Sequence, residues 1–578
     1  MERQVLNEAE QATWIRYGKT GPRPPTPEFF STIQTWIEEC GTTRHRLCPP
    51  HPTSPLPTRV LKIEQQRGDF KVRLHEGNGE KLRYATLSYC WGKYQPLSTT
   101  KENLSDHLTG IRWSSLPRTF QDAVVITHGL GIHYLWIDSL CILQNEKDDW
   151  EREAAQMKNI YTYCCFSIAA AGGNDSRHGL FPREQDENSQ GKDREFARCA
   201  RHYLWTSSVL FTRAWVLQER LLSPKIIYFY EDEVLMECPS NVRCQCGGGN
   251  SLSDSGIGYQ SWAETFAATK TCGDNETFYF RFVDAGLQMN CRYMMRQLQG
   301  QLQGASSAEA IAPILPLREG LAMLRLWDEL LGHYCQRYIT KISDRLPALS
   351  GVAWVFGWTG VFGEYFAGIW SAWALQLLLW YIDSEELLKP EPPSEDDLRP
   401  APSWSWASVR GAWSYRRFPV DACVATFKTC DMDLVGQDSL GAVKNGIITV
   451  EGYVAMATIQ YDPLPLERQH DPDFTYADRL KAQKVELVKD GEKGKMCQDF
   501  VLDAVTNPVN SGAVVLCLGI QVDKYSALQA DEKSQPSVMQ GLVLRIVESN
   551  PGLFSRIGVF QSPMAWFEPG ETAEITIC

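Results

Sequence analysis

Between residues 83 and 240 the chain alternates short apolar runs with segments of helical periodicity, and this alternation limits the folds open to it. The runs RYATLSYCW (83–91) and CFSIAAAGG (165–173) predict buried strands. LPRTFQDAVVITHGLG places apolar residues at helical spacing and has proline near its start, which predicts a helix over about 117–129. Strands and helices in this order are typical of a parallel α/β sheet.

The rest of this region continues the same alternation. YLWIDSLCIL (134–143) is apolar apart from Asp138 at its middle, and it predicts one buried strand. A helix is predicted to begin near Asp148 or Asp149. TRAWVLQERLLS (212–223) predicts a further helix, followed by one or two strands in KIIYFYEDEVLMEC. Before all of these, VLKIEQ and FKVRLHE alternate apolar and polar residues and start the sheet.

Changes in composition divide the chain into predicted parts. Residues 1–60 form a Pro-rich N-terminal arm, and 61–240 form the α/β domain. After a Gly/Ser-rich linker at 246–258, residues 259–382 are predicted to be mainly helical. Strand patterns from 403 to 578 predict a β-rich C-terminal unit. A length of 578 residues is too great for one compact core, which agrees with several domains.

Charge and hydropathy exclude some classes of partner. The formal net charge is −13 and no basic block stands out, so nucleic-acid binding is not expected. The N-terminus lacks the apolar core of a secretory signal, which predicts a cytoplasmic protein. The apolar stretch at 352–382 is long enough to span a bilayer, but it contains Glu364 and several glycines. We expect packed, Trp-rich core segments there and no membrane span.

Cysteine and histidine spacing leaves a zinc site open without favouring it. The 18 cysteines are spread along the chain and many lie in apolar runs, which predicts reduced, buried thiols. Two clusters could together supply tetrahedral ligands, but neither has the paired C-x2-C spacing of a strong zinc site. These clusters are Cys40, His45 and Cys48 and, further along, Cys238, Cys244 and Cys246. No metal is therefore predicted.

Three blocks of the α/β region, in the right order, resemble the heterokaryon incompatibility (HET) domain family. They are RYATLSYCWG (83–92), YLWIDSLCILQ (134–144) and RAWVLQERLLSPK (213–225). GLFPRE (179–184) and APSWSWASVRG (401–411) also look like the family. The resemblance implies a role in fungal non-self recognition and programmed cell death. It also implies self-association through the HET domain, or association with another incompatibility protein, as the partner interaction.

The HET family is in turn similar to TIR domains, which share a flavodoxin-like parallel sheet. Trp215 and Glu219 form W-x-x-x-E on a predicted helix, similar to the helix that carries the catalytic glutamate of NAD-cleaving TIR domains. This resemblance implies Glu219 as the catalytic carboxylate and Asp138 as the group that orients the ribose or the glutamate. It implies NAD as a possible substrate, with no cofactor required. Loops after Tyr89, Asp138 and Ala171 would gather at the carboxyl ends of the strands.

Further residues would complete a nucleotide site under the same resemblance. Tyr89, Trp91, Gly92 and Trp215 are the candidates for binding, because a tryptophan ring could stack on nicotinamide or adenine. Each has a structural alternative as well. The tryptophans could pack the sheet, and Gly92 could serve a tight turn.

The two acids also have structural alternatives. Glu219 could form a salt bridge with Arg213 or Arg220, and Asp138 could belong to a buried polar network. Cys141 could be a nucleophile beside His128 or His133, although a cysteine between Leu140 and Ile142 in a strand is usually inert. The sequence therefore leaves open whether the protein is a TIR-like NAD glycohydrolase or a non-enzymatic interaction module.

Overall fold

The chain divides into two compact units, Met1–Ala310 and Ile311–Cys578. The computed structural model describes residues 25–40, 53–181, 208–230, 234–238, 241–244, 250–251, 317–357, 360–382, 400–409, 413–415, 423–461, 485–498, 512–523, 538–568 and 570–578. Most of the predicted linker at 246–258 and most of the Pro-rich arm lie outside these residues, although Asn250–Ser251 of the linker form a short strand. The finer division into four parts stays a prediction.

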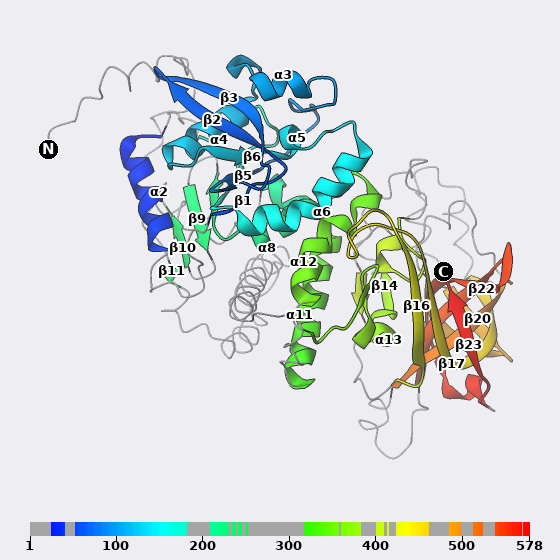
Figure 1. Ribbon diagram of the computed structural model, residues 1–578. Helices are drawn as coiled ribbons and strands as arrows, with labels where there is room; N and C mark the ends of the chain where they lie inside the picture. The colour runs from blue at the N-terminus through cyan, green and yellow to red at the C-terminus, as the bar shows by residue number, and fades with distance from the viewer. Residues whose placement is uncertain are drawn as a thin grey trace, which may run out of the picture. The chain divides into compact units, whose positions relative to one another are not determined.

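A nine-stranded mixed sheet forms the frame of the N-terminal unit (Figure 1), in the order β11-β10-β9-β8-β7-β5-β6-β2-β3. Its central strands pair in parallel, β6 with β5, β5 with β7 and β7 with β8. These are β5 (Ala85–Ser88), β6 (Tyr134–Trp136), β7 (Ser167–Ala169) and β8 (Ile226–Phe229). They are almost wholly buried and apolar, as strands covered on both faces must be. The predicted parallel sheet is therefore present.

Helices connect the parallel strands. Arg118–Gly129 (α4) follows β5, and Lys147–Tyr163 (α6) follows β6, so both predicted helices are confirmed. Ala214–Leu222 (α8) lies between β7 and β8 and confirms the third. Pro117 precedes α4, where the fixed φ of proline suits a helix start. Each helix supplies the crossover that a parallel strand pair requires.

Antiparallel strands extend the sheet at both edges. One edge is a hairpin of β2 (Arg59–Gln66) and β3 (Asp69–Glu76), which starts the sheet where the alternating pattern predicts it. The other edge contains β9 (Val234–Cys238), β10 (Asn241–Cys244) and β11 (Asn250–Ser251). Smaller elements complete the unit: α2 (Pro27–Glu39), β1 (Ser54–Pro55), β4 (Lys81–Leu82), α3 (Leu104–Thr109) and the 3-10 turns Trp113–Ser115 and Val209–Thr212.

The prediction of one buried strand over 134–143 is wrong in its second half. The strand ends at Trp136, and Asp138–Cys141 (α5) forms a single helical turn. The Asp138 carboxylate accepts a hydrogen bond from the Ser139 amide at 2.7 Å, and the Ile142 amide bonds to the Asp138 carbonyl. A short acidic side chain that bonds its neighbouring backbone competes with a strand ladder, which explains the early end. Asp138 therefore lies immediately beyond the carboxyl end of β6.

The order of the parallel strands places β5 at a reversal of direction. The chain runs from β5 to β6 on one side of it, and then continues to β7 on its other side. In open α/β sheets the crevice at such a reversal opens at the carboxyl ends of the strands and is where ligands bind. The residues that follow Ser88 and Trp136 therefore lie at the position where a ligand is expected.

The first part of the C-terminal unit is helical only in part. Leu317–Cys335 (α11) and Pro347–Gly357 (α12) are helices, but short strands follow. These are β12 (Tyr365–Phe366), β13 (Ile369–Trp370) and β14 (Trp380–Ile382), with the one-turn helix Ala374–Leu377 (α13) between β13 and β14. The mainly helical region predicted for 259–382 is therefore not confirmed, and residues 252–316 lie outside the description.

The apolar stretch at 352–382 belongs to this mixed region. It is divided between α12 and the short strands, and its aromatic side chains pack around the buried Trp327. Trp370, for example, meets the Trp327 ring at 5.5 Å between centroids. Among the described residues, no helix has the length and hydropathy needed to cross a bilayer.

The rest of the unit is an eight-stranded, largely antiparallel sheet, which confirms the β-rich C-terminal prediction. Its strands are β16 (Thr426–Leu434), β17 (Val443–Tyr461), β18 (Val485–Lys489), β19 (Glu492–Gln498), β20 (Val514–Asp523), β21 (Val538–Val547), β22 (Asn550–Pro563) and β23 (Thr572–Ile577). Trp413–Tyr415 (β15) pairs with β14 instead. Residues 499–511 of the predicted β-rich unit lie outside the described residues.

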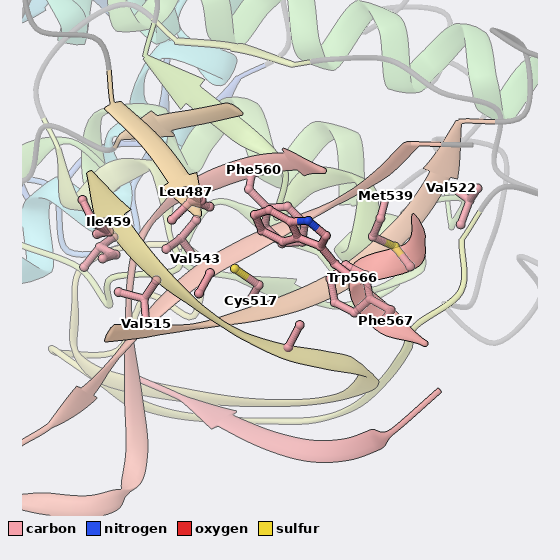
Figure 2. Close-up of a cluster of buried hydrophobic side chains, with 13 residues drawn as sticks. Ile459, Leu487, Val515, Cys517, Val522, Met539, Val543, Phe560, Trp566 and Phe567 are labelled. Carbon is pink, nitrogen blue, oxygen red and sulfur yellow. The ribbon is translucent and has the colours of Figure 1, made fainter. Parts of the chain in front are cut away.

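The strands of this sheet enclose an apolar core. Figure 2 shows Phe560, Trp566 and Phe567 among aliphatic side chains from several strands. The Phe560 and Phe567 rings stack at 5.9 Å between centroids, and both are almost fully buried. The long strand β17 pairs with β16, β18, β20 and β23, so it joins most of the sheet. Burial of these aromatic side chains supplies much of the stabilisation of the sheet.

One tight backbone approach in this sheet yields a stability prediction. A Cβ atom at Gly541 on β21 would overlap the carbonyl oxygen of Leu518 on β20, and backbone cannot move aside as a side chain can. We expect Gly541→Ala to lower the free energy of unfolding by about 1–3 kcal/mol. Chemical denaturation of the purified chain measures this change.

Gly332→Ala is the matched control. Gly332 lies in α11 with no atom within 4 Å of the added Cβ, so alanine should leave stability unchanged or raise it by up to about 1 kcal/mol. Equal stability of Gly541→Ala and the wild type would show that the β20–β21 approach is not as close as described.

Candidate active site

Glu219 lies at the carboxyl end of the central strand. Its side chain, on α8, is 93% buried and accepts a hydrogen bond from the Ser88 hydroxyl, the last residue of β5. The Tyr161 hydroxyl of α6 lies beside the same carboxyl group. Three segments far apart in sequence therefore meet at one acid, at the sheet position where the strand order predicts a ligand.

Burial changes the acidity of this carboxyl group. Removal from water raises the pKa of Glu219 from 4.5 to about 7, and the nearby negative charge of Asp138 adds to the rise. The Arg213 guanidinium and the Ser88 hydrogen bond act against it. A carboxyl group whose pKa lies near neutrality can exchange a proton or hold a charge at physiological pH, which is a property of catalytic acids.

Asp138 is the second acid of the cluster. Its carboxylate accepts hydrogen bonds from the Trp91 indole at 2.8 Å and from the Ser139 amide at 2.7 Å. Burial raises its pKa too, although Arg213 and these hydrogen bonds partly offset the rise. The residue keeps partial solvent exposure, unlike Glu219. Asp138 is thus oriented by donors on α5 and on the loop after β5, and it remains within reach of a ligand.

Tyr89 joins the two acids from the end of β5. It is 2% exposed, and its ring packs edge-on against Phe120 at 5.0 Å between centroids. Its hydroxyl lies beside Asp138 and Ser139 without a hydrogen bond of good geometry to either. Burial and the Asp138 charge raise the pKa of this phenol well above its usual value, so Tyr89 is a hydroxyl donor here and not a base.

Arg213 is the cation of the cluster. It directly precedes α8, and its guanidinium donates a hydrogen bond to the Tyr89 carbonyl. Its positive charge lowers the pKa of both Glu219 and Asp138. Glu219 nevertheless forms no ion pair within 4.0 Å among the described residues. The salt bridge considered from sequence for Glu219 is therefore not formed with either arginine, because Arg220 instead pairs with the buried Glu237 at 3.3 Å.

Two of the predicted binding residues contact other parts of the domain. The Trp215 ring meets Trp150 of α6 edge-on at 6.2 Å, and both rings are partly exposed. Gly92 has φ +73°, and a Cβ there would overlap Asp175 on the loop after β7. Gly92 therefore permits the tight turn that follows Trp91, which is the structural role considered for it from the sequence. The structure brings together Glu219, Asp138, Tyr89 and Trp91, and Trp215 lies about one helical turn before Glu219 on α8.

Other sequence alternatives find little support among the described residues. The Cys141 thiol is fully buried, and burial raises its pKa to about 12, so it is not a nucleophile. No cluster of three potential metal ligands occurs in the described part of the chain. His45, Cys48 and Cys246 of the two spaced clusters lie outside that part. Cys40 and Cys141, like the other cysteines described, are free thiols.

Sequence reasoning missed three members of the cluster. Ser88 and Tyr161 were not singled out, and Arg213 was considered only as a salt-bridge partner. Ser88 carried a usable signal, because a polar residue that ends a buried strand lies at the carboxyl edge of a parallel sheet. Tyr161 carried none, since an apolar-face position on α6 predicts core packing alone.

The arrangement suits cleavage of a bond that develops positive charge. Two carboxyl groups stand close enough for the charge of one to raise the pKa of the other. Ser88, Trp91 and Ser139 donate to them, which fixes their orientation before a ligand arrives. Paired, preoriented carboxyl groups stabilise an oxocarbenium-like transition state in glycoside chemistry.

Comparison with known proteins identifies the region that holds this cluster. Residues 84–219 match the family model described as Heterokaryon incompatibility protein (HET). The match begins just before β5 and ends at Glu219, so it contains all members of the cluster. The HET resemblance of the three sequence blocks is thereby confirmed. No significant match was found among curated proteins or among solved structures.

The pKa of Glu219 makes stability depend on pH. A buried acid with a raised folded-state pKa stabilises the fold below about pH 4.5, and this contribution is lost as pH rises through about 7. Glu219→Gln keeps an acceptor for Ser88 and removes the ionisation. We expect the wild type to lose up to roughly 3 kcal/mol relative to Glu219→Gln between pH 5 and pH 8. Urea unfolding of both proteins at the two pH values measures the difference.

A constant difference across this pH range would contradict the burial of Glu219. Subtracting the unfolding free energy of the variant from that of the wild type removes the contributions of other ionisable groups, provided that the N-terminal unit of each protein unfolds in one transition.

Proposed function

We propose that this protein acts in heterokaryon incompatibility and that its HET domain cleaves the nicotinamide–ribose bond of NAD, which kills the cell by depleting the cofactor. The observation that carries the proposal is the buried Glu219 carboxyl group at the carboxyl end of β5, bonded to Ser88 and neighboured by Asp138. The proposed location in the cell is the cytoplasm, where NAD is abundant and where recognition of a non-self partner would trigger cell death.

The strand order supports the comparison with TIR domains. Numbered along the chain, the four parallel strands lie in the order 2-1-3-4, which is the order of a flavodoxin-like sheet. Glu219 lies on the helix between the third and fourth of them, as the resemblance to NAD-cleaving TIR domains implies. Its fourth preceding residue is Trp215, so the W-x-x-x-E pattern lies on one helix face.

The proposed reaction is hydrolysis. The bond between ribose C1′ and the nicotinamide nitrogen breaks, its electron pair leaves with the ring, and nicotinamide departs neutral. Water adds to the oxocarbenium carbon and releases one proton, giving ADP-ribose. Ionised Glu219 would accept hydrogen bonds from the ribose hydroxyls and stabilise the positive charge as it develops. Asp138, held by Trp91 and Ser139, would orient the ribose.

Two aromatic side chains border the acids. Trp91 is partly exposed, and its indole nitrogen is already committed to Asp138, so a ring face remains for stacking. Tyr89 offers a buried hydroxyl next to Asp138. A flat, positively charged nicotinamide ring would be bound by such a ring face and by the two carboxylates together.

A non-enzymatic role is the second candidate. Ser88, Trp91 and Ser139 donate hydrogen bonds to the two acids, an arrangement that suits a rigid polar network as well as a ligand site. Under this hypothesis the HET domain signals for cell death by associating with itself or with another incompatibility protein. Side chains such as Tyr94 and Val209, 59% and 47% exposed, would then belong to the associating surface.

A single substitution separates the two functions. We expect purified wild type at high concentration to release nicotinamide from NAD, and Glu219→Gln to reduce release at least 100-fold while remaining folded. Glu153→Gln is the matched control, because Glu153 is equally buried but belongs to a different cluster with Arg59 and Asp149. No release by assembled, folded wild type would rule out the enzyme and favour the interaction module.

The pH profile tests the role of the ionised form. Because burial raises the pKa of Glu219 to about 7, the carboxylate fraction grows through neutrality. The rate of nicotinamide release should rise about tenfold per pH unit below that pKa and level off above about pH 8. Initial rates at saturating NAD from pH 5 to pH 9 check this. A rate that instead falls with pH would assign Glu219 as a proton donor.

A further inference from the structure

The site contains an arginine, Arg213, whose charge reaches Glu219, Asp138 and Tyr89 at once. This charge helps to keep the two acids ionised. Nicotinamide leaves as a neutral ring and the developing charge is positive, so breaking the bond does not itself require a cation at the reacting carbon. The guanidinium can therefore also serve to bind a negatively charged ligand group.

The geometry of Arg213 leaves it able to bind such a group. One terminal nitrogen, Nη1, donates to the Tyr89 carbonyl, which fixes the guanidinium at the end of β5. No other hydrogen bond or ion pair of this side chain occurs within the described residues, and it is partly exposed. A planar guanidinium anchored at one nitrogen still presents further N–H groups, and their fork matches the oxygens of a phosphate.

The backbone that follows Arg213 favours an anion at the same place. Arg213 directly precedes α8, whose first turn contains no acidic residue and has no side-chain cap, so its leading amide groups carry partial positive charge. The Tyr89 hydroxyl lies next to the acids instead, beside Asp138 and Ser139, and forms no hydrogen bond of good geometry although Tyr89 is 98% buried. It can donate to a ligand atom that binds next to the acids.

The cluster thus contains charges of both signs. The carboxyl groups accept hydrogen bonds from Ser88 and Ser139, and the guanidinium donates to the Tyr89 carbonyl. NAD has the complementary distribution, with a positive ring joined through ribose to a negative diphosphate. A nucleoside without phosphates would fill only the acidic side.

We infer that Arg213 binds the diphosphate of a dinucleotide substrate and so selects NAD over the corresponding riboside. This inference rests on the proposed function, since it assigns the substrate class of that site. Arg213 is a binding residue in it, whereas Glu219 and Asp138 face the ribose.

Binding of ADP-ribose tests the assignment without turnover. Isothermal titration of the full chain should show that Arg213→Gln weakens ADP-ribose binding by about 10- to 100-fold, the effect of losing a charge-assisted hydrogen bond. Arg177→Gln is the control, because Arg177 lies on the loop after β7 but is paired with Asp175 at 2.6 Å and stacked on Tyr94. It should bind ADP-ribose as the wild type does.

A comparison of two substrates separates phosphate binding from the effect of Arg213 on its acidic neighbours. Loss of the guanidinium raises the pKa of Glu219 and slows cleavage of NAD and of nicotinamide riboside alike. The ratio of kcat/KM for NAD to that for the riboside cancels this common effect. We expect Arg213→Gln to lower the ratio by about 10- to 100-fold, mainly through KM for NAD.

The outcomes distinguish this inference from the proposed function. Unchanged ADP-ribose affinity and an unchanged substrate ratio in Arg213→Gln would overturn the inference while leaving hydrolysis intact. Equal losses in the Arg213 and Arg177 variants would overturn it too, since they would indicate general surface charge. If ADP-ribose binding depends on Arg213 but the wild type releases no nicotinamide, the inference about Arg213 would be upheld and the proposed NAD hydrolysis would be ruled out. No binding and no release by the wild type would overturn both.

Discussion

The hydrogen bond from Ser88 to Glu219 is the contact on which the arrangement of the HET region depends. It joins the last residue of the central strand to a helix that enters the fold more than a hundred residues later. Because the acid is buried, leaving it without that donor would cost considerably more than the bond itself is worth. The position of α8, and with it Arg213 and the end of the matched region, is therefore tied to the end of β5. A site whose hydrogen bonds are formed before a ligand binds is suited to catalysis, because it needs no reorganisation during the reaction.

Much of the N-terminal fold could be predicted from local patterns. The alternation of short apolar runs with helical spacing identified β5, α4, α6, β7 and α8 correctly, since each pattern reports burial on a defined face. The turn at Asp138 could not be read in this way. Its apolar neighbours satisfy a strand pattern, and only the bonds of its carboxylate to Ser139 and Trp91 show why the strand stops. The prediction of a mainly helical region at 259–382 was not confirmed for a similar reason, because tryptophan-rich runs suit helices and short strands equally.

The site itself was predictable where a residue type is unusual for its setting. Glu219 and Asp138 are acids in apolar segments, and such residues require partners or a function. The resemblance to TIR domains then supplied the hypothesis that Glu219 is catalytic, which burial alone does not imply. Arg213 was visible in the sequence only as a nearby charge. The role of Arg213 depends on the carbonyl to which its guanidinium donates. The fold sets this contact by placing Arg213, which precedes α8, next to Tyr89, which follows β5.

The strand β23 has a consequence for the stability of the C-terminal unit. β23 pairs along β17 and also touches β22, and the backbone of Cys578 bonds to Phe554 and Ser403. Loss of β23 would thus expose the edge of β17, the longest strand in the sheet, and bare strand edges invite aggregation. Such a loss would leave the whole HET region in the chain, yet it would lower the amount of folded protein through clearance of the misfolded product.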